Sequence, residues 1–293
     1  MNHSSVSDKI VDAVNAVLLA AVALVMLFPF FYIFAVSFSS YEEYVQSELL
    51  LWPKHWVLDS YRYIFGSNAF VRSLGVTVFV TIAGTLFNLL LTSTMAYALS
   101  RGIWGQKTFL VMVLFTFIFS AGIIPSYLVV KATGLLDTYW SLIVPGAISS
   151  FNLIVIRQFF QNIPHELQEA ALIDGANDLR IFTRIVLPLS KPALAAFGLF
   201  YAVGHWNTYF GAILYISDPK KWTVQVVLRQ IVILEEAATT LNPAKDAMLG
   251  ANPPPPETIG MAAILLATLP ILIVYPFLQK HFAKGVMLGS VKG

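Results

Sequence analysis

The chain has 293 residues, of which 57% are hydrophobic and only 12% are charged, and its mean hydropathy is +0.73. This composition excludes an ordinary soluble globular domain. The net charge of +2 gives no indication of a nucleic-acid partner. The chain contains no cysteine, which excludes a disulfide framework and a thiolate metal site.

The apolar residues are gathered in long blocks, and a helix needs about 20 such residues to cross a bilayer. Six blocks approach or exceed this length, at approximately 13–38, 73–99, 108–130, 138–156, 192–216 and 259–278. The first block is too long for a signal-peptide core and no clear cleavage site follows it, so we interpret it as a retained anchor. The sequence therefore predicts an all-α, polytopic membrane protein with six transmembrane helices. They form a single transmembrane domain over residues 1–293, with both termini on the same side.

Charges in the connecting segments give only a weak orientation. With both termini inside, the inner side carries ten Lys and Arg residues and the outer side carries eight. The blocks themselves contain no Asp, Glu, Lys or Arg, and His205 is their one ionisable histidine. Because ionisable groups at membrane depth usually mark proton or ion paths, their absence argues against a proton-driven carrier. A sodium site built from backbone carbonyls escapes this argument.

The chain also lacks the nucleotide-binding and metalloprotease motifs Gly-x-x-x-x-Gly-Lys-Ser/Thr and His-Glu-x-x-His. We therefore expect no catalytic residues, no metal site and no cofactor in this chain. The energy for any transport must therefore come from elsewhere, and a separate ATPase is the simplest source.

The most polar long segment, 164–190, lies between two of the apolar blocks. Pro164 suits the first turn of a helix, and Gly175 suits the left-handed residue that ends one. Asn177 or Asp178 can cap a second helix, and Pro188 is placed to break or kink it near its end. The pattern predicts two helices joined by a sharp turn outside the bilayer. The simplest alternative is an ordinary interfacial hairpin without a partner.

This segment resembles the cytoplasmic loop motif of ABC-importer permeases, in particular those of the maltose-importer type that take up carbohydrates. The matching residues are Glu169, Ala170, Ala171, Gly175, Ile185, Leu187 and Pro188. In that family the loop is the coupling helix that inserts into the ATP-hydrolysing subunit. The resemblance implies that Glu169 meets a basic residue of the ATPase and that Asp174 either joins this contact or caps the helix locally.

The C-terminal sequence 279–293 is similar to the tails of carbohydrate-importer permeases, which reach the ATPase pair, so Lys292 and Gly293 are further candidates for coupling. The resemblance implies a second permease, which is either a homologous partner or a second copy of this chain. It also implies two ATPases that bind ATP and Mg, an external solute-binding protein and a bacterial inner-membrane location with both termini cytoplasmic. The runs 255–261 and 285–287 are similar to permeases for polysaccharide fragments, so we expect an oligosaccharide substrate, with an alginate fragment as the specific hypothesis.

A polar cluster in the fifth block supplies the candidate substrate path. His205 and Asn207 can hydrogen-bond to sugar hydroxyls, and Trp206 and Tyr209 can stack on pyranose faces. Asn152 in the fourth block is a further candidate. The alternative is that such residues tie helices together by hydrogen bonds, which we favour for Asn88, Thr92 and other isolated polar residues.

Two outer segments remain open to interpretation. Tryptophan and tyrosine in 39–72 suit an aromatic belt at the membrane surface, or part of a docking surface for the binding protein. The outer loop 217–258, with an expected short helix at 224–238, is either a surface cap or a docking element. For the whole chain, the rival hypotheses are an ion-coupled secondary transporter acting alone and a non-transporting membrane anchor.

Overall fold

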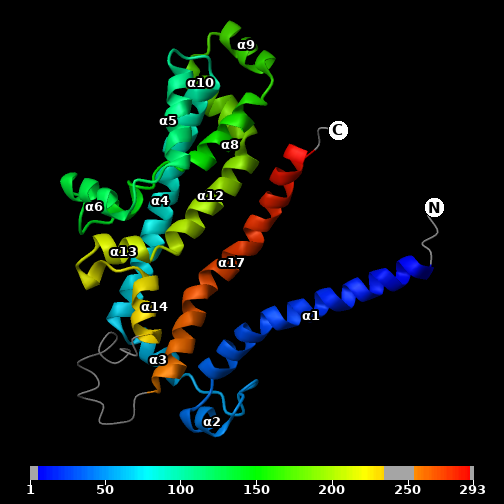
Figure 1. The fold of residues 1–293 in the computed structure, drawn as a ribbon, viewed down its shortest axis with the longest axis vertical. Coiled ribbons are helices and arrows are strands. Elements are labelled where there is room, and N and C mark those ends of the chain that lie inside the picture. Colours follow the sequence, from blue (N-terminus) through cyan, green and yellow to red (C-terminus); the bar gives the residue numbers. More distant parts are fainter. Residues whose placement is uncertain (1–5, 234–253, 291–293) are drawn as a thin grey trace. The chain divides into compact units, whose positions relative to one another are not determined.

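We describe the structure from a computed structural model, over residues 6–233 and 254–290. Every regular element in these two ranges is a helix, so the predicted all-α class is confirmed there (Figure 1). In chain order the helices are α1 (Val6–Ser37), α2 (Tyr41–Gln46), α3 (Asp59–Phe65), α4 (Asn68–Ser100), α5 (Gln106–Ile118), α6 (Ile123–Ala132), α7 (Trp140–Ile143), α8 (Ser150–Gln161), α9 (His165–Ile173), α10 (Asp178–Ile181), the π-helix η1 (Phe182–Val186), α11 (Leu187–Leu189), α12 (Lys191–Trp206), α13 (Phe210–Tyr215), the 3₁₀-helix η2 (Pro219–Lys221), α14 (Val224–Val232) and α17 (Pro256–Ser290).

Three described helices contain stretches long and apolar enough to cross a bilayer, at Lys9–Ser37, Asn68–Ser100 and Pro256–Pro276. They correspond to the first, second and sixth predicted blocks. A fourth candidate is the pair Asp178–Leu189 and Lys191–Trp206, which is bent by 81° at its break.

The other predicted blocks are interrupted, which apolar periodicity alone did not indicate. Block 108–130 is divided into α5 and α6, because Phe119 is extended and Gly122 has a φ of +83°. Block 192–216 is divided into α12 and α13 after Trp206. Block 138–156 is not one helix either: α7 ends at Ile143 and α8 begins only at Ser150. Pro145 lies in that gap, and proline cannot donate a helical hydrogen bond.

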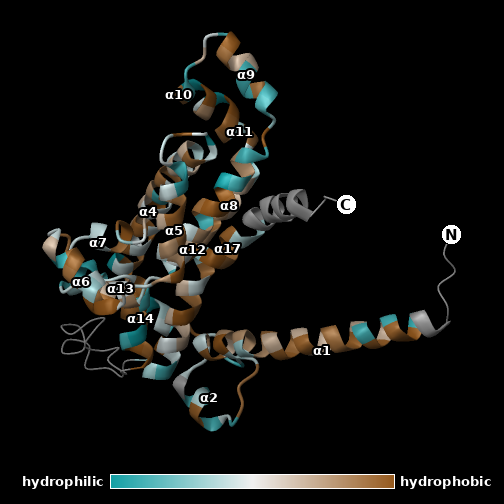
Figure 2. Cartoon of the chain, turned by 45° about the horizontal axis from the view of Figure 1, so that its top comes forward, coloured by the Kyte–Doolittle hydropathy of each residue, from teal (hydrophilic) through white to brown (hydrophobic). Residues whose placement is uncertain are grey.

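The chain divides into two compact units, which we describe separately. The first contains residues 1–71 and 228–268. Its α1 has no buried residue in the apolar window, and Figure 2 shows this helix hydrophobic along most of its length. A hydrophobic helix exposed on all sides is typical of a membrane span.

The end of α1 carries an aromatic cluster formed by Phe34, Phe38, Trp52, Trp56 and Tyr61. The ring centroids of Phe38 and Tyr61 are 4.8 Å apart, and the Tyr61 hydroxyl donates to Ser37 Oγ at 2.8 Å. Burial raises the pKa of Tyr61. Trp52 and Trp56 remain more than half exposed, so this face is available either to lipid headgroups or to a protein.

The second unit contains residues 72–227 and 269–293. One of its apolar clusters joins α4, α8 and α12 with the segment after α9, through fully buried Leu153, Ile156, Ile181 and Val186. The other joins α4 with α7, α13 and α14, around Val80, Ile143 and Ala212. Since α4 contributes to both clusters, it is the element on which the candidate sites of this unit are built.

Candidate functional site

The segment 164–190 forms the helix hairpin that its sequence predicts. Figure 1 shows α9 and α10 together at one end of the second unit. Gly175 has a φ of +75°, the Ala176 amide donates to Ala171 O at 2.9 Å, and the Gly175 amide donates to Leu172 O at 3.0 Å. These two bonds are the Schellman arrangement, which satisfies carbonyls that a helix end leaves free. Gly175 therefore ends α9 as expected.

The second arm of the hairpin begins with a side-chain cap. Asn177 Oδ1 accepts from the Arg180 amide at 2.9 Å, so Asn177, and not Asp178, is the N-cap of α10. Pro164 lies one residue earlier than expected, at the N-cap of α9 and not in its first turn. Pro188 is in the first turn of α11, which ends one residue later, and the 81° bend follows at Ser190.

Most of the predicted coupling residues lie on the surface. Glu169, Ala170, Asp174, Gly175 and Pro188 are exposed, and Ala171, Ile185 and Leu187 are half-buried. Large apolar side chains are exposed beside them: Ile173 is 87% exposed and Leu179 is 69% exposed. The hairpin thus presents a carboxylate together with uncovered apolar groups, a combination that suits docking into a groove of another protein. Lys292 and Gly293 lie outside the described residues.

One arginine, which the sequence analysis did not single out, contacts both arms of the hairpin. Arg101 follows the last residue of α4; its Nη1 donates to Gln168 Oε1 of α9 and its Nη2 donates to Asp178 Oδ1 of α10, the latter at 2.9 Å. Its guanidinium also lies 5.5 Å from the ring centroid of Tyr97. The only sequence signal was a basic residue directly after an apolar block.

The candidate path residues lie around the end of α12. His205, Trp206 and Asn152 are buried, Asn207 is exposed and Tyr209 is half-buried. His205 Nε2 lies 3.1 Å from Asn88 Nδ2 of α4. A Cβ at Gly84 would lie only 2.5 Å from His205 Nε2, so the missing side chain of Gly84 is what admits the imidazole. In this chain His205 therefore holds α4 and α12 together, which is the alternative role.

A second contact one turn away extends this polar seam, by which we mean Thr81, Thr85, Asn88 and Thr92 of α4 with the residues of α12 that face them. Thr92 Oγ1 and the Tyr201 hydroxyl are 2.8 Å apart, and this hydroxyl also accepts from the Ser149 amide at 3.2 Å. The expected role of Asn88 and Thr92 in joining helices agrees with these contacts.

The seam is incompletely satisfied at its centre. Within the described residues, Thr81 Oγ1, Thr85 Oγ1 and Asn88 Oδ1 are buried without a hydrogen-bond partner. Spaced at i, i+4 and i+7, they share one face of α4. Buried polar atoms are nearly always paired, so three exceptions on one face of α4 are unusual.

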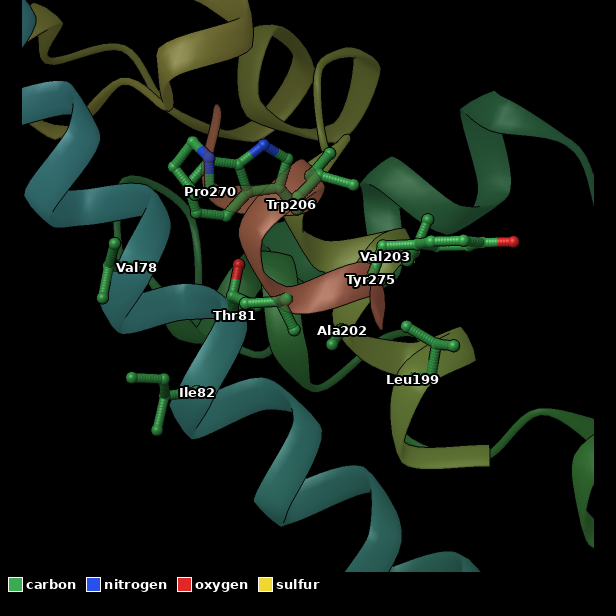
Figure 3. Close-up of a pocket in the computed structure, with 11 residues that line it drawn as sticks. Val78, Thr81, Ile82, Leu199, Ala202, Val203, Trp206, Pro270 and Tyr275 are labelled. Carbon is green, nitrogen blue, oxygen red and sulfur yellow. The ribbon is translucent and has the colours of Figure 1, made fainter. Parts of the chain in front are cut away.

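Trp206 lines an apolar cavity of about 280 Å³ (Figure 3). The cavity is bounded by α4, α12 and the later part of α17, all within the second unit. Its lining residues are Val78, Thr81, Ile82, Leu199, Ala202, Val203, Trp206, Pro270, Ile271, Val274 and Tyr275. An apolar lining suits hydrocarbon and not sugar hydroxyls, so this side of Trp206 is not a polar path.

An ionic clasp connects two loops at the far end of the same unit. Asp137 accepts from the Asp218 amide at 3.0 Å and from Lys221 Nζ at 3.0 Å. The Asp218 bond first, and then the Lys221 ammonium, hold the pKa of Asp137 below its usual value. Asp137 has a φ of +57°, which is uncommon for a residue with a side chain.

Comparison with known proteins identifies the family. Residues 88–288 match the model of the family described as "Binding-protein-dependent transport system inner membrane component". The chain belongs to this family. It is a transport permease, the membrane subunit of an ABC importer, and the expected resemblance is thereby confirmed. The matched range includes the hairpin and most of the polar seam.

Similar proteins agree over nearly the whole length. The chain is 50% identical to Protein LplC of Bacillus subtilis (strain 168), covering 99% of this chain and 98% of that protein. It is 53% identical to the Polygalacturonan/rhamnogalacturonan transport system permease protein YtcP of the same organism, covering 92% and 94%.

A solved structure confirms the fold. A chain from the crystal structure of a bacterial ABC transporter involved in the import of the acidic polysaccharide alginate superimposes with a TM-score of 0.90 at 36% identity, covering 96% of this permease and 100% of that chain. The type I permease fold is therefore established. These likenesses support the importer subunit over the ion-coupled carrier acting alone.

Proposed function

We propose that this permease forms half of the translocation path for an acidic oligosaccharide and is driven by a separate ATPase that docks on the α9–α10 hairpin. The observation that carries the docking is the hairpin itself: a locally capped structure with exposed Glu169, Ile173 and Leu179. The protein makes no covalent change in the sugar. It converts the closing of the ATPases into alternating access of the helices.

The substrate class rests on what the similar proteins are named for. One is a permease for polygalacturonan and rhamnogalacturonan, and another belongs to an importer of alginate, which its description calls acidic. All three polymers contain uronic acids, so we propose a uronate oligosaccharide over a neutral one. Since the predicted membrane blocks contain no Lys or Arg, recognition of the carboxylates is left to the binding protein and the second permease.

The assembly that we propose contains this chain, a homologous second permease, two ATPases and an external solute-binding protein in a bacterial inner membrane. The hairpin and both termini face the cytoplasm. Exposed Asn207 and half-buried Tyr209 are the best candidates in this half for contact with the sugar, because His205 and Asn152 are buried between helices.

The test is reconstitution of the whole complex in proteoliposomes. We expect ATP hydrolysis to rise when the binding protein is added with galacturonate or alginate oligosaccharides, and to stay at its basal level with neutral arabino- or galacto-oligosaccharides. Equal stimulation by neutral sugars would overturn the acidic class. Uptake driven by an ion gradient without the ATPases would overturn the importer mechanism.

A separate experiment tests on which side of the membrane the hairpin lies. Since the chain contains no cysteine, a single one can be introduced and labelled specifically. Ile173→Cys should react with an impermeant thiol reagent in inside-out vesicles but not in right-side-out vesicles. It should also be protected when the ATPase is bound. The opposite sidedness would contradict the coupling role of the hairpin.

A further inference from the structure

The hairpin is attached to the rest of the second unit by very few groups of its first arm. Among the residues of α9, Gln168 is the one that is buried, with 5% of its surface exposed. Glu169 and Ala170 of the coupling motif are exposed, whereas Ala171, three residues after Gln168, is half-buried and packs against the apolar cluster. A force that the partner applies to α9 is therefore transmitted through Gln168, through the packing of Ala171 and through the two ends of the helix.

Gln168 is held by the same side chain that holds the second arm. One nitrogen of the Arg101 guanidinium donates to Gln168 Oε1, and the other donates to Asp178 Oδ1 at 2.9 Å. A guanidinium presents its donors in a rigid planar fork, so it fixes the positions of two acceptors relative to each other. Arg101 thus joins α9 to α10 across the turn at Gly175.

Arg101 is itself fixed to the end of α4. The ring of Tyr97, one helical turn earlier, lies beneath the guanidinium, and it also packs against Phe182 in a tilted arrangement with centroids 4.9 Å apart. The carbonyl of Leu99 accepts from Arg157 Nε at 2.7 Å and from Gln106 Nε2 at 2.7 Å. The backbone of Arg101 therefore follows directly after a helix end that α5 and α8 hold in place.

We propose that Arg101 is a positioning residue that makes the two arms of the hairpin and α4 move as one body. Movement of the docked hairpin then reaches the membrane helices through this residue. Without it, the partner can still dock and hydrolyse ATP, but the hairpin moves with less effect on α4. This inference rests on the proposed coupling role of the hairpin and adds the residue that transmits the motion.

The decisive measurement is the number of sugar molecules taken up per ATP hydrolysed by the reconstituted complex. We expect Arg101→Gln to lower this ratio about fivefold, which is the size of effect that coupling residues produce, while assembly and basal hydrolysis stay near the wild-type level. Arg101→Lys should recover only part of the ratio, because an ammonium cannot reproduce the fork. A loss of folding or assembly alone would lower both quantities and leave their ratio unchanged.

Lys107→Gln is the matched control, since Lys107 is an exposed cation in the first turn of α5 and its replacement removes the same charge close by. We expect it to leave the ratio unchanged. An unchanged ratio in Arg101→Gln, or an equal fall in Lys107→Gln, overturns the proposal.

A distance measurement tests whether Arg101 holds the hairpin and α4 together, without relying on transport. Spin labels at Gly102→Cys and Thr183→Cys report on α4 and the second arm; both sites are exposed, and a Cβ at Gly102 meets nothing within 4 Å. We expect one narrow distance distribution that is the same with and without ATP, and a broad one after Arg101→Gln. A wild-type distance that changes with ATP overturns the proposal. If the distances behave as expected but no binding protein stimulates hydrolysis, the proposed function is wrong, whereas the proposed role of Arg101 in holding the hairpin and α4 together is supported.

Discussion

The hairpin and the polar seam differ in how far apart in the sequence their hydrogen-bond partners lie. In the hairpin, the turn and caps use partners three to five residues away, such as Asn177 with Arg180 and Ala176 with Ala171. In the seam, Asn88 meets His205 117 residues later and Thr92 meets Tyr201 109 residues later. The surface that we propose for docking can thus be built locally, whereas contacts between α4 and α12 exist only after these helices have packed.

The largest effect is expected from Gly84→Val, which tests the long-range packing at the seam. Even a Cβ at this position would lie 2.5 Å from the His205 ring, so the larger side chain has to separate α4 from α12. We expect a loss of roughly 1–3 kcal/mol of stability from such overpacking. The measurement is the thermal unfolding midpoint of the purified complex.

Gly75→Val supplies the control, because Gly75 is also in α4 but a Cβ there meets nothing within 4 Å. It should shift the midpoint far less. Adding His205→Ala to Gly84→Ala should return part of the lost stability. If the second substitution only adds to the loss, the imidazole is not what requires a glycine.

The corresponding test of the hairpin is Gly175→Ala. A Cβ at Gly175 meets nothing within 4 Å, so the cost is conformational, and an alanine at a φ of +75° should lose roughly 1 kcal/mol. We expect weaker co-purification of the ATPase with little change in the unfolding of the membrane helices. Gly175→Asn should be milder, because asparagine tolerates left-handed backbone. Equal effects of Ala and Asn would indicate a steric and not a conformational requirement.

Two threonines sharpen the comparison within the seam. Thr92→Val removes the contact with the Tyr201 hydroxyl and should cost about 1 kcal/mol, whereas Thr85→Val removes a hydroxyl whose oxygen has no partner among the described residues and should be nearly neutral. Unfolding midpoints of both variants give the answer. A Thr85→Val variant as unstable as Thr92→Val would show that Thr85 Oγ1 is bound by an ordered water.

The smallest expected effect is a pH dependence at the Asp137 clasp. Because the folded pKa of Asp137 is lowered, its contribution to stability is present above the ordinary value of 3.8 and is lost as the pH falls through the folded value. The side chain of Asp137 is 40% exposed, so solvent screens the interaction and the contribution is small. Asp137→Asn should flatten the fall of the unfolding midpoint below about pH 4. An unchanged acid slope would show that other carboxylates dominate it.

The same difference between local and long-range contacts explains which features the sequence could predict. Pro164, Gly175 and Asn177 act through their own backbone neighbours, so the hairpin and its turn were predictable to within a residue. The pairing of Gly84 with His205, and the reach of Arg101 to Gln168 and Asp178, depend on which helices meet, and no local pattern contains that information. The interruption of block 138–156 was missed because apolar composition continues through Pro145 while the backbone does not.

The length of α4 has a mechanical consequence. Near one end, Thr77 Oγ1 accepts from the Val224 amide, the first residue of α14, at 2.8 Å, and directly beyond the other end lies Arg101. The 24 residue steps from Thr77 to Arg101 span about 36 Å of helix, more than the hydrocarbon thickness of a bilayer. A continuous helix resists compression, so an axial shift at the Arg101 end reaches Thr77, whose side chain contacts the start of α14. One helix thereby connects the proposed docking hairpin to the segment that begins α14.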